Sequence, residues 1–190
     1  MKKYFKAIVT IFVIVILSQL SCKILEFENN PLVIDITIEE DFHVQSNGTV
    51  FNKDEIVSLS DLYADSGIPL DSIQDVSVKN IRIIISENHT AAGSQLTFLQ
   101  ITFSPNLVNS YSLANMSSPV AINAILDNPI DPFSLVGTLG LNPAGIAQLT
   151  SALETSPPPN IRLTLNTTVS AAPVDFKANV IISLQVKYQP

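Results

Sequence analysis

The carboxyl-terminal segment 161–188, IRLTLNTTVSAAPVDFKANVIISLQVKY, has the clearest structural pattern in the chain. Apolar and polar residues alternate along both of its halves, and a period of two places one face of a β-strand against a core. In the second half, all eight even positions from Val174 to Tyr188 are apolar or aromatic. The Ala172-Pro173 pair predicts a turn between the halves. The segment therefore predicts two strands, the second of them long and packed against a sheet.

Shorter runs with the same alternation predict further strands upstream. The phase of the apolar–polar alternation changes between Val78 and Ile81, which predicts a β-bulge. The polar stretch 88–93 predicts a hairpin between the strands on either side of it. Asn47-Gly48 predicts another turn. The upstream runs begin at Leu32 and then occupy residues 55–59, 76–85, 96–103 and 119–126.

Two segments depart from this alternation. Ile146, Leu149 and Leu153 recur at helical spacing after Pro143, and the three prolines at 157–159 end the pattern, so residues 143–155 are predicted to form the principal helix. Residues 60–67 predict one or two helical turns, with Ser60 as the N-cap and Gly67 as the stop.

The element pattern favours one fold class. Seven or eight predicted strands without alternating helices favour an antiparallel β-sandwich of the immunoglobulin-like type, formed by a single domain over residues 32–190. The lead from Leu70 to Ile85 resembles small bacterial envelope lipoproteins with such sandwiches, and this resemblance transfers no functional residue. Because the chain has no Trp and one Cys, the immunoglobulin-like label describes architecture only.

The amino terminus has the pattern of a signal peptide. Lys2, Lys3 and Lys6 precede an uncharged run from Ala7 to Leu17. As a helix this run would span roughly 17 Å, whereas the hydrocarbon core of a bilayer is about 30 Å thick. A cleaved leader is therefore favoured over a retained membrane anchor, which stays the alternative.

The cysteine at position 22 follows Leu20 and Ser21, and this stretch resembles a bacterial lipobox, although Gln19 stands where the family usually has an apolar residue. The resemblance implies that residues 1–21 are removed and that Cys22 receives diacylglycerol and a further acyl chain. It also implies attachment to the cell envelope, at the outer membrane, with residues 22–31 as a tether. The alternative is an ordinary buried cysteine.

The charge of the mature chain limits its partners. Cleavage removes three of the ten basic residues, so seven remain against seventeen acidic ones, a formal net charge of −10. The remaining Lys and Arg are scattered singly, whereas a nucleic-acid surface needs them clustered. Nucleic acid is therefore excluded as a predicted partner, and membrane association is expected to depend on the lipid.

No catalytic or cofactor motif is recognisable. His43 and His89 lack metal-ligand spacing, and the acidic residues at 39–41 and 61–75 lack the spacing of a calcium loop. The chain also has no Gly-x-Ser-x-Gly elbow, dinucleotide fingerprint or phosphate loop. We therefore expect no metal, no cofactor and no enzymatic activity.

Two long connections, 104–118 and 127–145, combine Asn, Ser and Pro with apolar side chains. Leu107, Tyr111 and Leu113 are the candidate contacts with a protein or glycan partner, and the alternative is that they pack on the edge of the sandwich. The sequence thus predicts a lipid-anchored, non-catalytic binding or scaffolding module. A carrier of an apolar ligand between the sheets and an enzyme with an unrecognised site remain open.

Overall fold

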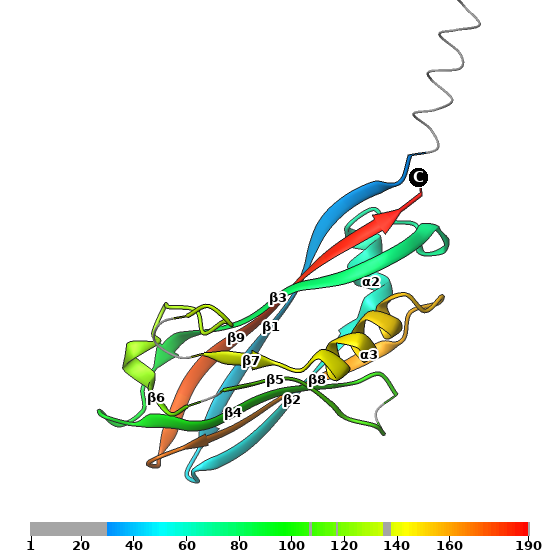
Figure 1. The fold of residues 1–190 in the computed structure, drawn as a ribbon. Coiled ribbons are helices and arrows are strands. Elements are labelled where there is room, and N and C mark those ends of the chain that lie inside the picture. The colour runs from blue at the N-terminus through cyan, green and yellow to red at the C-terminus, as the bar shows by residue number, and fades with distance from the viewer. Residues whose placement is uncertain (1–29, 107, 117, 135–137, 190) are drawn as a thin grey trace, which may run out of the picture.

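Two antiparallel β-sheets pack face to face in the computed structural model, which describes residues 30–106, 108–116, 118–134 and 138–189 (Figure 1). The predicted antiparallel sandwich is therefore confirmed. The smaller sheet has the order β1 (Leu32–Ser46), β9 (Val174–Tyr188), β3 (Ile73–Asn88). The larger has the order β2 (Val50–Ser58), β8 (Asn160–Val169), β4 (Gln95–Ser104), β5 (Tyr111–Met116), β7 (Leu139–Leu141), and the short β6 (Val120–Ala121) also pairs with β4.

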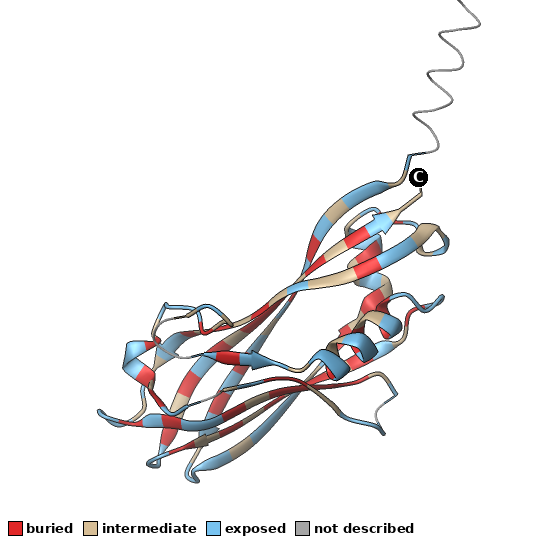
Figure 2. Cartoon of the chain, in the orientation of Figure 1, coloured by how far each residue is buried: buried red, intermediate tan, exposed pale blue. Residues whose placement is uncertain are grey.

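The core lies between the sheets because each long strand turns its apolar residues inward. In β9 every even position from Val174 to Val186 is buried, as the alternation predicts. Figure 2 shows this pattern as buried segments alternating along the strands of both sheets. The strand β1 pairs with β9 over its full length, from Leu32 opposite Tyr188 to Ser46 opposite Val174. The predicted bulge is present, as a register shift between Val78 and Asn80.

The predicted hairpin between the strands flanking residues 88–93 is wrong. β3 pairs with β9 in the smaller sheet, whereas β4 pairs with β8, β5 and β6 in the larger one. The connection carries the chain across the sandwich, so that the apolar faces of β3 and β4 meet in the core instead of lying side by side. Alternation predicts the strands, but it does not say which strands pair.

The predicted strand over 119–126 is also shorter than expected. It ends at Ala121, and residues Ile122–Ala124 form the 3-10 helix η2. Ile122 and Ile125 are both fully buried. Their separation of three residues matches one 3-10 turn. Both side chains can therefore face the core from the same side of the turn, without an extended backbone.

Two α-helices cover the sandwich together. α3 (Pro143–Leu153) confirms the principal predicted helix, and the Asn142 side chain caps its first turn. α2 (Leu59–Asp65) begins earlier than predicted: Ser58 is its N-cap, and Ser60 lies inside the first turn. Gly67 follows the helix with a φ of 69°, which suits its predicted role as the stop. A second 3-10 helix, η1 (Leu70–Ser72), leads into β3. Across the described ranges, helices are too short or too polar to span a membrane.

Candidate functional site

The outer face of the larger sheet carries a polar groove of about 380 Å³. We call it the outer-face groove. Strands β2, β4 and β8 supply its floor, and the connection between β4 and β5 supplies one wall. Its lining residues are Asn52, Asp54, Gln100, Thr102, Ser104, Val108, Ser110, Arg162, Thr164 and Asn166.

The strand register brings these side chains together. Asn166 of β8 lies opposite Asn52 on one side and Gln100 on the other, which forms a row of three amides across the sheet. Along β8, the residues that alternate with Arg162, Thr164 and Asn166, such as Leu165, are buried in the core. Because neighbouring residues of a strand point to opposite faces, the polar residues share the outer face.

Amide and hydroxyl groups in and beside the groove bond to one another. Asn52 Nδ2 donates to Asn166 Oδ1 at 2.8 Å, and Gln100 Nε2 donates to the Ser112 hydroxyl at 3.3 Å. Each primary amide has two N–H donors and one oxygen that accepts twice. These two hydrogen bonds therefore leave donors and acceptors of this row available to a ligand.

The two charged groups of the groove neutralise each other. Asp54 Oδ1 accepts a hydrogen bond of 2.8 Å from the Thr164 hydroxyl, and Asp54 Oδ2 lies 3.8 Å from Arg162 Nε. Both charged side chains are about two-fifths exposed, at 43% and 36%. The lining as a whole thus has no net charge, in a chain whose formal net charge is −7.

Apolar side chains lie exposed beside the polar rows. Val50 and Phe98 lie opposite Thr168 on its two sides, and they are 70% and 42% exposed. Val108, in the wall of the groove, is 83% exposed. At the floor, the Ser104 hydroxyl is buried without a hydrogen-bond partner among the described residues, which is uncommon for a buried polar group.

The candidate contacts predicted from sequence lie elsewhere. Cys22 and Leu107 fall outside the described residues. Leu113 is fully buried, so its prediction as a surface contact is wrong. Residues 111–116 form the strand β5 between β4 and β7, and an inner strand turns its apolar residues into the core. Tyr111 is half-buried, with its ring 5.5 Å from that of Phe103.

His43 lies in β1 and His89 directly follows β3, and the two histidines contact different carboxylates. His43 Nε2 is 2.9 Å from Asp175 Oδ1, and this hydrogen bond lowers the pKa of Asp175. His89 is 3.9 Å from Glu87, whose pKa is lowered chiefly by its hydrogen bond with Lys177. Within the described ranges, no three His, Cys, Asp or Glu side chains are grouped to hold a metal.

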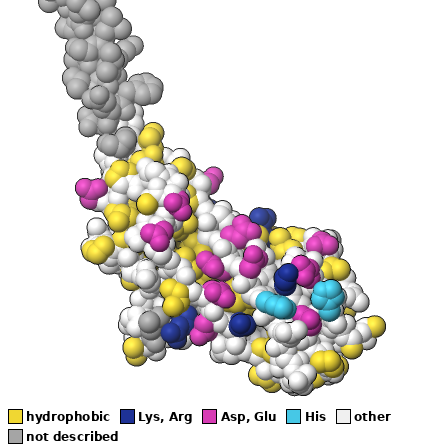
Figure 3. Space-filling view, turned by 180° about the vertical axis from the view of Figure 1, so that it is seen from behind, with side chains coloured by type: hydrophobic (Ala, Val, Ile, Leu, Met, Phe, Trp, Pro, Cys, Tyr) yellow, Lys and Arg dark blue, Asp and Glu magenta, His cyan; other side chains and the backbone are white. Residues whose placement is uncertain are grey.

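The acidic run 39–41 is divided between the two faces of β1. Asn179 Nδ2 donates to Glu39 at 2.8 Å and to Asp41 at 2.9 Å on the outer face. Figure 3 shows acidic side chains gathered on this side of the molecule, beside both histidines. Glu40, between them in sequence, is half-buried and has the inward phase of β1.

Comparisons with known proteins do not identify the chain. No protein-family model matches it, and neither does any curated protein. Among solved structures, a chain from Desmodium yellow mottle tymovirus is 11% identical, with 85% of this chain and 90% of that chain covered and a TM-score of 0.36. A chain from turnip yellow mosaic virus is 9% identical, with 82% and 93% covered and a TM-score of 0.33. Similarity at this level supports no inference about this chain.

Proposed function

We propose that the chain is a lipid-anchored binding module of the bacterial cell envelope, and that it holds a neutral glycan in the outer-face groove. The main support for this proposal is the lining of the groove. It consists mostly of amides and hydroxyls, and the charges of Asp54 and Arg162 cancel. Sugar hydroxyls both donate and accept hydrogen bonds, as do amides and hydroxyls in proteins. The exposed Val50, Phe98 and Val108 offer apolar surface to the C–H faces of sugar rings.

Binding without catalysis fits the groups present in the groove. Its carboxylate, Asp54, is held by Thr164 and Arg162. A general acid or base would need a second titratable group placed to exchange a proton with it. The remaining lining residues are amides, hydroxyls and one valine, which can orient a ligand without reacting with it.

The proposed anchor suits a module that works close to a membrane. Lipid on Cys22 would attach the chain ten residues before Leu32, and a chain of that length reaches at most about 35 Å. Leu32 lies opposite Tyr188, so β1 begins at the same end of the sandwich as the carboxyl terminus (Figure 1). The domain would be attached to the membrane at this end, and it would reach only partners in the nearby envelope.

The space between the sheets favours this proposal over a carrier of apolar ligands. Phe42, Phe103 and Phe176 are among the largest fully buried side chains, and they come from both sheets, so they fill the middle of the interior, away from the edge between β1 and β2. A drug-sized ligand needs a cavity of about 300 Å³ or more. The groove on the outer face offers that volume without displacing the core.

Photocrosslinking in the envelope tests the proposal. A benzophenone amino acid at position 100, inside the groove, should yield a product that glycan-cleaving treatment removes. The same group at position 185 is the matched control, because Gln185 lies on the outer face of the other sheet and bonds Asp35. A product at position 100 that only proteases remove would show a protein partner and overturn the glycan assignment. Equal products at both positions, or none, would overturn the groove as the binding site.

A further inference from the structure

The strands β1 and β2 follow each other in the chain but belong to different sheets. β1 pairs only with β9, and β2 pairs only with β8, in the described part of the molecule. Each therefore has one edge without a strand partner, and these edges border the same side of the sandwich. An unpaired strand edge presents a row of N–H and C=O groups that can pair with another chain.

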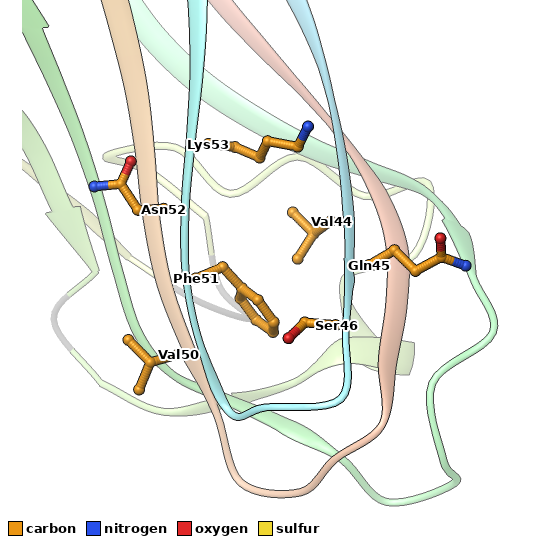
Figure 4. Close-up of a pocket in the computed structure, with 7 residues that line it drawn as sticks. All are labelled: Val44, Gln45, Ser46, Val50, Phe51, Asn52 and Lys53. Atoms are coloured by element: carbon orange, nitrogen blue, oxygen red, sulfur yellow. The ribbon is translucent and has the colours of Figure 1, made fainter.

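The space between these two strands is hollow, and we call it the β1–β2 seam. Near the turn it holds a cavity of about 270 Å³, and near α2 a second one of about 420 Å³. Figure 4 shows Val44 and Ser46 of β1 and Phe51 of β2 pointing into the gap between the strands, whereas Gln45 points away from it. Farther along, Ile38 and Val57 continue the apolar floor.

Acidic side chains face into the seam from both sheets. Glu40 lies between Ile38 and Phe42 in the inward phase of β1, and Glu55 has the inward phase of β2. Burial raises the pKa of Glu40 first, and the charges of Glu55 and Asp41 raise it further. The inward phases of β1 and β2 place both carboxylates on the seam side of their strands, which agrees with the effect of the Glu55 charge on Glu40.

The seam is acidic toward α2, whereas no acidic residue lines the cavity near the turn. Besides Glu40, the cavity near α2 is lined by Asp61 and Asp65 of α2 and by Glu39 of β1. Lys53 is the single basic residue among those that line the two cavities. A bound segment would therefore gain from positive charge, and an acidic one would be repelled.

From these observations we propose that the seam accepts an extended, basic segment of a partner protein, which adds as a strand to the free edge of β1. Backbone hydrogen bonds to β1 supply affinity, and alternate side chains supply specificity. The inward side chain opposite Glu40 is Lys or Arg, within reach of Glu55. The residues two positions before and after it are apolar, because they pack beside Ile38 and Phe42. This site is separate from the outer-face groove and does not depend on it.

Selection from a displayed library of random nine-residue peptides tests the proposal on the purified full-length chain in detergent. We expect enriched peptides to alternate apolar residues with a central Lys or Arg. The double variant Glu40→Gln with Glu55→Gln should weaken binding of the strongest peptide at least about tenfold, since charged hydrogen bonds are lost. Asp35→Asn is the matched control, because Asp35 lies on the opposite face of β1, bonds Gln185 and lines neither cavity, and it should leave the affinity within about twofold.

Hydrogen exchange separates strand addition from simple charge attraction. Binding should slow exchange of β1 amides between residues 38 and 44. If the selected peptides lack a basic residue, or if nothing is enriched, the inward carboxylates act only to protect the edge and the proposal is wrong. Binding that depends on Glu40 and Glu55 but leaves the β1 amides unprotected would also contradict it. Thermal melting of the double variant confirms that it is folded.

Discussion

The hydroxyl group of Tyr63 donates a hydrogen bond of 2.9 Å to the carbonyl oxygen of Leu153, which joins α2 to the last residue of α3. Tyr63 is fully buried. Burial raises the pKa of this phenol, and the nearby charge of Glu154 raises it further. A carbonyl at a helix carboxyl end lacks an intrahelical partner. The bond therefore satisfies that carbonyl and holds two helices that are distant in sequence.

Replacing Tyr63 with Phe should lower the free energy of unfolding by about 1–2 kcal/mol, because it leaves the Leu153 carbonyl buried and unpaired. Urea denaturation measures this change. Tyr188→Phe is the control, since no hydrogen bond of that hydroxyl is seen within the described part of the chain, and it should alter stability little. Equal effects of the two substitutions would show that the Tyr63 bond contributes nothing specific.

Gly145 is predicted to be intolerant of any side chain. It lies in the first turn of α3, where an added Cβ would overlap the backbone carbonyl of Ser112 in β5. Gly145→Ala should therefore destabilise the domain by about 1–3 kcal/mol through overpacking. Gly140→Ala is the matched control, because its Cβ would meet Asn115 O at an ordinary 3.6 Å. A thermal melt in which both variants match wild type would mean that α3 can move away from β5.

Glu40 should make stability depend on pH in an unusual direction for a carboxylate. Its pKa is raised by burial and then by Glu55 and Asp41, so the folded state binds the proton more readily than the unfolded state. The destabilisation from the ionised form is fully present above the raised pKa, and it disappears as the pH falls below about 4, the usual range of glutamate. Glu40→Gln should thus raise the melting temperature at pH 7 and lose that advantage near pH 4. A lower melting temperature at pH 7 would contradict this.

Local patterns predicted much of the secondary structure. The alternation in 161–188 and the helical spacing in 143–155 depend on neighbouring residues, so they are visible in the sequence. Pairing partners depend on contacts distant in sequence, which is why the sequence pattern predicts a hairpin of β3 and β4 that the structure does not have. The prediction that Leu113 is a surface contact fails for the same reason, because its strand β5 lies between β4 and β7 and turns Leu113 into the core.

The outer-face groove can likewise be predicted from the sequence only in part. The polar alternation in Arg162, Thr164 and Asn166 is visible in the sequence and indicates an outer face. Only the register of β8 with β2 and β4 places Asn52 and Gln100 beside Asn166. That register follows from how the whole core packs. A search for polar residues at every second position would have found the strands of the groove, but not the groove.

The proposed lipid anchor leads to a prediction of its own. Cys22→Ser should abolish incorporation of labelled fatty acid, because the thiol that would receive diacylglycerol is the only one in the sequence. The precursor should then remain uncut, or the protein should be released in soluble form. Equal labelling of the variant and wild type would rule out lipidation at Cys22. Cell fractionation of the same samples reports whether attachment follows the label.

The most direct test of the proposed glycan site in the outer-face groove is isothermal titration of the purified full-length chain with a panel of neutral oligosaccharides. We predict saturable binding of at least one neutral oligosaccharide. The double variant Gln100→Ala with Asn166→Ala should weaken it about tenfold or more, as expected from the loss of two hydrogen-bonding side chains. Gln185→Ala, on the opposite sheet, should bind like wild type. If no neutral oligosaccharide binds wild type, or if the double variant binds as tightly, the groove is not a glycan site.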